Sequence, residues 1–281
     1  MSGEALQAIP GIHGILGFLG ALSLICLGVD IFARPWRQTG DLSRPDVGWM
    51  TYLALAWFGY SSAIIVMLGV VELTALVMDP RSLPAIAIHA AAMQFALLAF
   101  CKGIIARHPA GVAFQKSING AAIGGSGLLP GLFFLLAALP LVSVSHYVWT
   151  WLLDLLANLT GAEPPEPQPM VELLLDTPGF GPAKMALMAV AGLLAPWAEE
   201  CFFRGVLYRA GKQVFSARGA VVLSAALFAL AHINLYAFGP LFVLGVMLAR
   251  AYECTGRLAV PIVMHAAFNL TNLAVIAVES A

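Results

Sequence analysis

Apolar stretches about as long as a bilayer is thick recur along the whole of this chain of 281 residues. An α-helix needs roughly 20 mostly apolar residues to cross the hydrocarbon core of a membrane. Apolar residues make up 60% of the chain and charged residues only 10%, against roughly 25% charged in a soluble domain. A soluble fold of this length could not hide so much apolar surface. The sequence therefore predicts an all-α, polytopic membrane helical bundle.

The windows of highest hydropathy predict about eight transmembrane helices. We expect them at residues 13–33, 49–78, 84–105, 128–156, 183–208, 218–237, 239–253 and 258–278. The second is about thirty residues long and contains Gly59 and Gly69, so we expect it to be tilted or broken. The seventh is short for a full span, and an acidic, proline-rich loop at 157–182 divides the chain into two halves.

Charge and cysteine content exclude several classes of function. The formal net charge is −1, so no overall field favours an anionic partner, and we expect no nucleic-acid binding. The four cysteines lack Cys-x-x-Cys spacing, which argues against both a disulfide scaffold and a cysteine-rich zinc site.

Two adjacent glutamates stand inside the predicted fifth helix. A charge at mid-bilayer costs at least about 2.5–3.5 kcal/mol, so ionisable residues there are candidates for function. Arg204 follows Glu200 by four residues, and positions four apart share a helix face, so we expect these two side chains to pair. Glu199 projects about 100° away on the same helix. One carboxylate is then neutralised and the other remains available.

Two further predicted helices each carry polar or aromatic residues four apart. Phe228 and His232 share one face of the sixth, and His265 and Asn269 share one face of the eighth. His89 is instead a single imidazole in an apolar helix, and we expect it to be a neutral histidine that is hydrogen-bonded between helices.

Together these residues form a minimum set for peptide hydrolysis inside a membrane. A buried carboxylate can take a proton from water, an imidazole can share that task or bind a metal, and amide or imidazole N–H groups can stabilise an oxyanion. Three alternatives remain open: a buried polar network that only holds helices together, a transporter or channel, and a non-catalytic scaffold or immunity protein. No inverted repeat relates the two halves, which argues against a transporter.

Three segments on apolar helices carry a family resemblance. EECFFR (Glu199 to Arg204), FALAH (Phe228 to His232) and HAAFN (His265 to Asn269) resemble, in this order, the motifs EExxxR, FxxxH and HxxxN. These are the motifs of the CPBP family, the CAAX-processing and bacteriocin-processing intramembrane proteases, which include the type II CAAX prenyl endopeptidases. The resemblance covers roughly residues 128–281.

The resemblance implies an intramembrane endopeptidase and a role for each motif residue. Glu199 and His232 would activate water, and Glu200 and Arg204 would support the site. His265 and Asn269 would form the oxyanion hole.

The resemblance also implies an organisation and a setting. Residues 128–281 would form the catalytic helical core, and residues 1–127 would be accessory transmembrane helices. The chain would be a multi-pass protein of the lipid bilayer, in the bacterial inner membrane, with a membrane-associated protein or peptide as its substrate.

Two questions about the chemistry stay open in the sequence. Glu199, His232 and His265 are the possible ligands of an open catalytic zinc site, whereas the competing account uses glutamate and histidine alone. The resemblance favours the account without a metal. Cys201 follows the glutamates directly, and a thiolate there would permit an acyl-enzyme and a sorting-type transpeptidase reaction.

Overall fold

The computed structural model describes residues 49–106, 127–161, 169–177 and 179–279. Every regular element in these ranges is helical and none is a strand, which confirms the all-α prediction. Six of the helices are long and apolar enough to cross a membrane: Leu53–Thr74, Leu83–Ile104, Leu128–Thr160, Pro182–Lys212, Leu235–Thr255 and Ala259–Val278. The helix predicted at 13–33 lies outside the described residues.

The chain folds into two compact units, which we describe separately. The first consists of Met1–Gln115 and Phe180–Val214, and the second of Lys116–Gly179 and Phe215–Ala281. The sequence analysis divides the chain by role, into accessory helices at 1–127 and a catalytic core at 128–281. That division stays a prediction.

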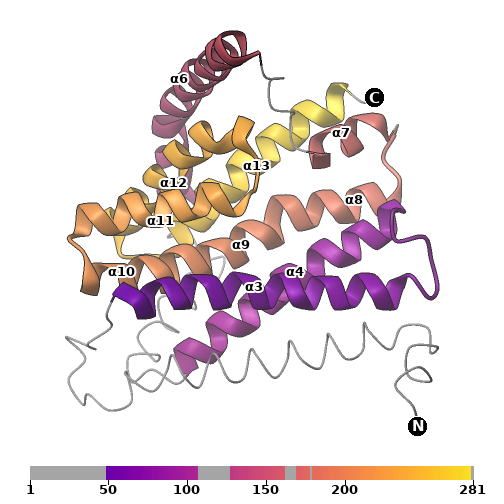
Figure 1. Cartoon of the computed structure of the whole chain (residues 1–281), viewed down its shortest axis with the longest axis horizontal. Helices are drawn as coiled ribbons and strands as arrows, with labels where there is room; N and C mark the ends of the chain where they lie inside the picture. The colour runs from indigo at the N-terminus through magenta and orange to yellow at the C-terminus, as the bar shows by residue number, and fades with distance from the viewer. Residues whose placement is uncertain (1–48, 107–126, 162–168, 178, 280–281) are drawn as a thin grey trace. The chain divides into compact units, whose positions relative to one another are not determined.

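The first unit is built on a helical hairpin and one long helical rod. The hairpin consists of α3 (Trp49–Thr74) and α4 (Leu83–Ala106), which pack along each other (Figure 1). The helix α3 is unbroken, so of the two predicted alternatives the break is not found, and a tilt stays a prediction. The rod packs against α4 along most of its length and comprises α8 (Pro182–Ala189), η1 (Val190–Leu194), α9 (Ala195–Glu200), η2 (Cys201–Tyr208) and α10 (Arg209–Val214).

Two segments of this rod, η1 and η2, are π-helical. Such widened turns are rare and often occur at functional sites. Pro196 gives a physical reason for η1, because a proline lacks an N–H and its ring collides with the carbonyl four residues earlier. The N–H of Ala195 bonds the carbonyl of Val190, five residues back, so the turn is already wide where the proline enters.

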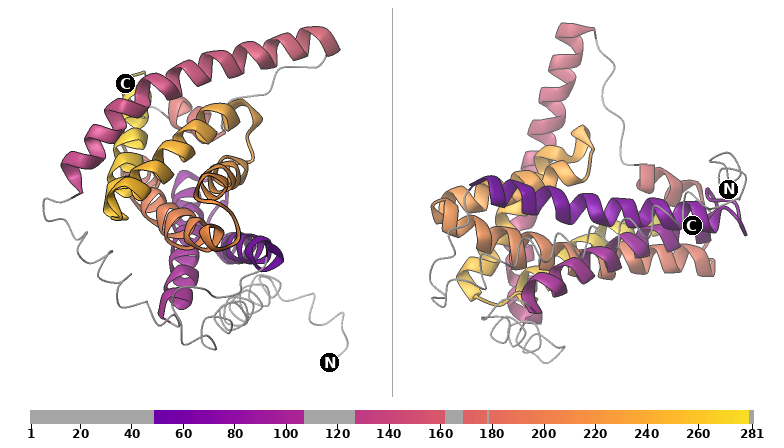
Figure 2. Two further views of the ribbon diagram at one scale, coloured as in Figure 1. Left: turned by 90° about the vertical axis from the view of Figure 1, so that its left-hand side faces the viewer. Right: turned by 60° about the horizontal axis from the view of Figure 1, so that its bottom comes forward.

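The second unit contains the remaining described helices. They are α6 (Leu128–Thr160), α7 (Pro169–Asp176), α11 (Ala217–Ala231), α12 (Leu235–Thr255) and α13 (Ala259–Glu279). The helix α12 packs against α11, α6 and α13. Glycines permit close approach, because a Cβ at Gly245 would lie 3.0 Å from the backbone of Ala225. Figure 2 shows α6 as one continuous helix, although it contains Pro140. Its 33 residues span about 50 Å, more than the roughly 30 Å of a hydrocarbon core.

Three predicted boundaries in the second half are corrected. The helix expected at 218–237 ends at Ala231 and has only 15 residues. The helix expected to be short, at 239–253, is instead the 21-residue α12. The loop expected at 157–182 contains the short helix α7. The first two errors have one cause, because the break between the helices comes earlier than the hydropathy indicates.

Candidate active site

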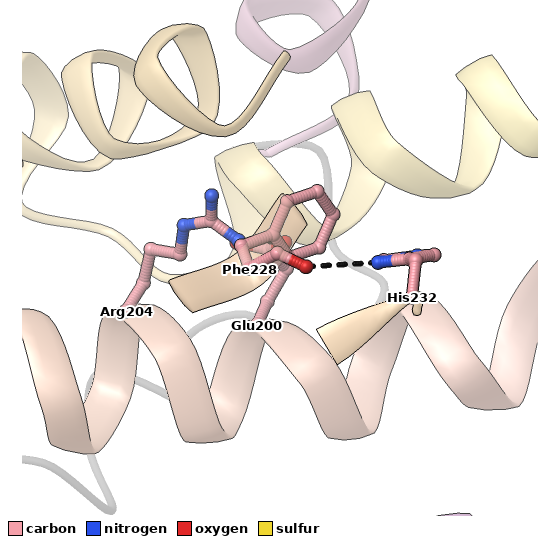
Figure 3. A network of polar contacts seen from close by, with 4 residues as sticks. All are labelled: Glu200, Arg204, Phe228 and His232. Atoms are coloured by element: carbon pink, nitrogen blue, oxygen red, sulfur yellow. Dashed lines mark hydrogen bonds and ion pairs between the residues drawn. The ribbon is translucent and has the colours of Figure 1, made fainter. Parts of the chain in front are cut away.

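A buried ion pair connects two motif residues of the first unit. Arg204 Nη1 donates to Glu200 Oε1 across 2.8 Å, and both side chains have no exposed surface (Figure 3). Glu200 ends α9 and Arg204 lies in η2, one turn later on the same rod. The predicted pair is confirmed. A buried charge requires such a partner, because an unpaired one would cost several kcal/mol.

Glu199 adds a second carboxylate beside this pair, with 8% of its surface exposed. The positive charge of Arg204 acts on Glu199 as well as on Glu200. Five residues separate Glu199 from Arg204, which is the hydrogen-bonding interval of a π-helix. The sequence predicts that the arginine serves only Glu200, whereas the structure shows one guanidinium whose field reaches both carboxylates.

The sequence analysis did not single out Tyr60, which lies in α3 and in the same unit as Glu199. Its ring packs on Phe202 and Phe203 of η2, with centroids 6.2 Å apart in each case, three and four residues after Glu199. The local signal is a polar run, Tyr60 to Ser62, in the middle of a largely apolar helix. Proximity between α3 and the rod arises from tertiary packing, so sequence spacing could not have revealed it.

In the second unit, His232 caps the C-terminal end of α11. Its backbone N–H bonds the carbonyl of Ala229, three residues back, rather than that of Phe228. The imidazole Nδ1 takes the place of that amide and lies 2.8 Å from the Phe228 carbonyl oxygen (Figure 3). A carbonyl oxygen only accepts, so Nδ1 carries the hydrogen and Nε2 of the neutral ring has the lone pair.

The Phe228 ring contacts both motif histidines, His232 and His265. Its centroid lies 4.9 Å from that of His232 and 5.5 Å from that of His265, with edge-to-face geometry at both rings. Phe228 is fully buried and His265 is 2% exposed. Asn269, half-buried, lies one turn after His265 on α13. The aromatic position of the Phe-x-x-x-His motif therefore brings together two imidazoles from different helices.

The short connection after His232 is held in an unusual conformation. Ile233 has a φ of 48°, which strains a β-branched side chain, and it is 85% exposed. Asn234 then caps α12 by accepting a hydrogen bond from the Ala237 amide, 2.8 Å away. From α6, the indole of Trp149 donates to the carbonyl of Leu235 across 2.8 Å. These bonds fix the backbone that follows His232. They explain why α11 ends earlier than the hydropathy predicts.

The structure thus assembles the predicted site residues within each unit. Glu199, Glu200 and Arg204 lie together in the first unit, and Phe228, His232 and His265 lie together in the second. The catalytic roles assigned to them, and that of Asn269, stay predictions.

A metal site gains no support from the structure. Among the described residues, no group of three or more His, Cys, Asp or Glu side chains is placed to hold a metal ion. The predicted zinc ligands Glu199, His232 and His265 are therefore not established as a set.

Two other predictions concern single side chains. Cys201 is only 3% exposed, whereas catalytic thiolates lie in partly exposed, electropositive surroundings, so its predicted role as a nucleophile finds little support. The hydrogen bond predicted for His89 is confirmed, because its Nε2 lies 2.6 Å from Thr74 Oγ1 and joins α4 to the end of α3.

The comparisons with known proteins agree with the motifs. Residues 181–271 match the family model described as type II CAAX prenyl endopeptidase Rce1-like, and this range contains all seven motif residues from Glu199 to Asn269. Neither the curated proteins nor the solved structures give a significant match to the chain. The six apolar helices and the family match mark an integral membrane protein and indicate a protease. The match over residues 181–271 confirms the resemblance of this chain to the CAAX intramembrane proteases.

Proposed function

We propose that the chain is an intramembrane endopeptidase that hydrolyses a peptide bond of a membrane-associated protein or peptide. The observation that carries the proposal is the bond from His232 Nδ1 to the Phe228 carbonyl. It leaves Nε2 as the basic nitrogen of the neutral ring, which is the form a general base needs. The family match at residues 181–271 supplies the reaction class.

In this proposal Glu199 and His232 activate the attacking water. The carboxylate accepts a proton from the water as it attacks the scissile carbonyl, and the histidine shares the proton and returns it to the leaving amine. Glu200 and Arg204 do not react. Their buried pair supports the site and sets the field at Glu199.

The second pair, His265 and Asn269, stabilises the oxyanion. Hydrogen-bond donors fixed in advance at a developing negative charge contribute strongly in surroundings that exclude water. His265 is buried against the Phe228 ring, which holds the imidazole in one place. The side-chain amide of Asn269, one turn along α13, is the second donor.

The place of these residues on apolar helices supports a membrane-associated substrate. All seven motif positions are on or beside apolar helices, which favours a peptide bond that approaches from the membrane. A prenylated or otherwise membrane-tethered C-terminal segment fits this setting. In the bacterial inner membrane, which we propose as the location, a bacteriocin leader or a membrane-protein tail fits equally well.

The test is peptidase activity of the purified protein in liposomes, with a proteome-derived set of membrane-tethered peptides. Wild type is compared with Glu199→Gln and with a matched control, Glu172→Gln, which changes an exposed carboxylate on α7. Loss of general-base function lowers the rate about 10²- to 10⁴-fold, so we expect cleavage by wild type and control only. Equal cleavage by all three proteins contradicts the proposal.

The same assay separates the account without a metal from zinc catalysis. We propose that side chains alone activate the water, so cleavage should persist in protein shown by elemental analysis to be free of metal. Loss of activity on chelation, restored by added zinc, would instead support zinc held by Glu199, His232 and His265.

A further inference from the structure

The hairpin of α3 and α4 lies outside the matched range, yet α3 closely approaches the helix that carries the glutamates. The contact is made at Gly59. A Cβ at this position would fall on the ring of Phe202 and would lie 2.9 Å from Phe100 Cε1. Only glycine leaves room for this approach, so the packing of α3 on η2 is specific at this point.

Tyr60, the next residue, packs against two aromatic rings of η2. Its ring centroid lies 6.2 Å from that of Phe202 and 6.2 Å from that of Phe203. These two phenylalanines pack edge to face on each other with centroids 5.1 Å apart, and each is 1% exposed. The direction of the phenol is therefore set by buried, tightly packed neighbours.

Glu199 is on the same side of the rod as these rings. It precedes Phe202 by three residues and Phe203 by four, and residues three and four apart are neighbours on a helix surface. The Tyr60 ring packs on Phe202 and Phe203, so its phenol lies on the face of the rod that Glu199 also occupies, within the first unit. A carboxylate only accepts hydrogen bonds, and a phenol hydroxyl is a suitable donor.

We propose that Tyr60 is a positioning residue for Glu199, whose hydroxyl holds the carboxylate in the orientation needed for water activation. This inference rests on the proposed function, in which Glu199 is the base. It also assigns a role to part of the first 127 residues: the hairpin of α3 and α4 supplies one side of the glutamate site and is not only accessory.

The test uses Tyr60→Phe, which keeps the ring packed on Phe202 and Phe203 and removes only the hydroxyl. The matched control is Tyr208→Phe, a second buried tyrosine of the same unit, whose ring lies under the Lys212 ammonium group. Loss of a hydrogen bond to a charged group changes an equilibrium or rate constant by about tenfold or more. We expect kcat of Tyr60→Phe to fall by about that factor. KM and the unfolding temperature should stay at the values of the control.

A second readout does not depend on catalysis. The carboxylate stretching band of Glu199, identified in infrared difference spectra by its loss in Glu199→Gln, should shift in Tyr60→Phe and remain in place in Tyr208→Phe. If wild type is active and Tyr60→Phe has the same kcat and the same Glu199 band as wild type, the positioning role is overturned and the proposed function stays intact. If wild type is inactive but the Glu199 band still shifts in Tyr60→Phe, the proposed function is overturned and the contact between Tyr60 and Glu199 is supported.

Discussion

Arg204 and Glu200 form a fully buried ion pair, 2.8 Å between Nη1 and Oε1, one helical turn apart on the rod that also carries Glu199. Removing both partners of a buried ion pair and removing only one of them change the free energy of unfolding by very different amounts. Replacing both charges by apolar groups of similar volume is often neutral, whereas removing one partner leaves an uncompensated buried charge.

Arg204→Met should therefore destabilise the protein by about 3–5 kcal/mol. The loss comes from the unpaired Glu200 carboxylate. Adding Glu200→Met to the same chain should restore most of the stability. The measurement is unfolding in mixed detergent micelles, with a double-mutant cycle over the two positions.

Activity should not recover with stability in that double variant. The charge of Arg204 acts on Glu199, and no apolar side chain replaces that field. A double variant that is both stable and fully active would show that the pair is only structural.

His232→Ala should leave a folded protein with kcat lowered about 10²- to 10⁴-fold, because a proton-transfer group is lost. The matched control is His146→Phe on α6, which keeps an aromatic ring against Tyr236, now 5.6 Å from the imidazole centroid. Steady-state kinetics of both variants in liposomes make the comparison. Equal loss in both would point to a general effect of removing a histidine.

Local spacing explains which parts of the site could be predicted from the sequence. Residues four apart share a face on any helix, so the pairing of Glu200 with Arg204 follows from the sequence alone. The same rule places Phe228 beside His232, although the contact itself runs through the Phe228 carbonyl as well as its ring.

What the sequence could not provide depends on turns and tertiary contacts. Apolar residues continue past His232, so hydropathy extends the helix to residue 237, whereas the backbone turns at Ile233 and begins α12 at Leu235. The widened turns of η1 and η2 leave no periodic signal in a uniformly apolar stretch. Tyr60 is about 140 residues from Glu199 in sequence, and only packing brings the two together.

Trp149→Phe should lower kcat and leave KM nearly unchanged, because it removes the indole donor that holds the Leu235 carbonyl. The phenyl ring still packs on Gly239, where a Cβ would lie 2.7 Å from Trp149 Cβ. The expected loss of stability is about 0.5–1.5 kcal/mol, the net worth of one hydrogen bond. The measurements are kinetics and unfolding in micelles.

Trp151→Phe on the same helix is the control for that variant, since Trp151 is 63% exposed. It should match wild type in both measurements. Comparable losses in the two variants would mean that the connection after His232 does not depend on the Trp149 bond.

Gly59→Ala should destabilise the first unit by about 1–3 kcal/mol, the usual cost of overpacking. Alanine is the better helix former by about 1 kcal/mol, so a stabilising result would mean that the Phe202 ring moves aside freely. The control is Gly181→Ala, because a Cβ there meets nothing within 4 Å. Unfolding in micelles gives both values.

Cys201→Ala should retain activity close to that of wild type. The thiol is buried at 3% exposure, where a thiolate nucleophile is disfavoured, and the proposed reaction uses water and not sulfur. Cys101→Ala is a matched control, since Cys101 is also a buried free cysteine, at 2% exposure. Turnover in liposomes is measured together with mass spectrometry of the intact protein during the reaction. Loss of turnover in folded Cys201→Ala, with an acyl adduct on the wild-type chain, would replace water by Cys201 as the attacking group and favour the transpeptidase reaction.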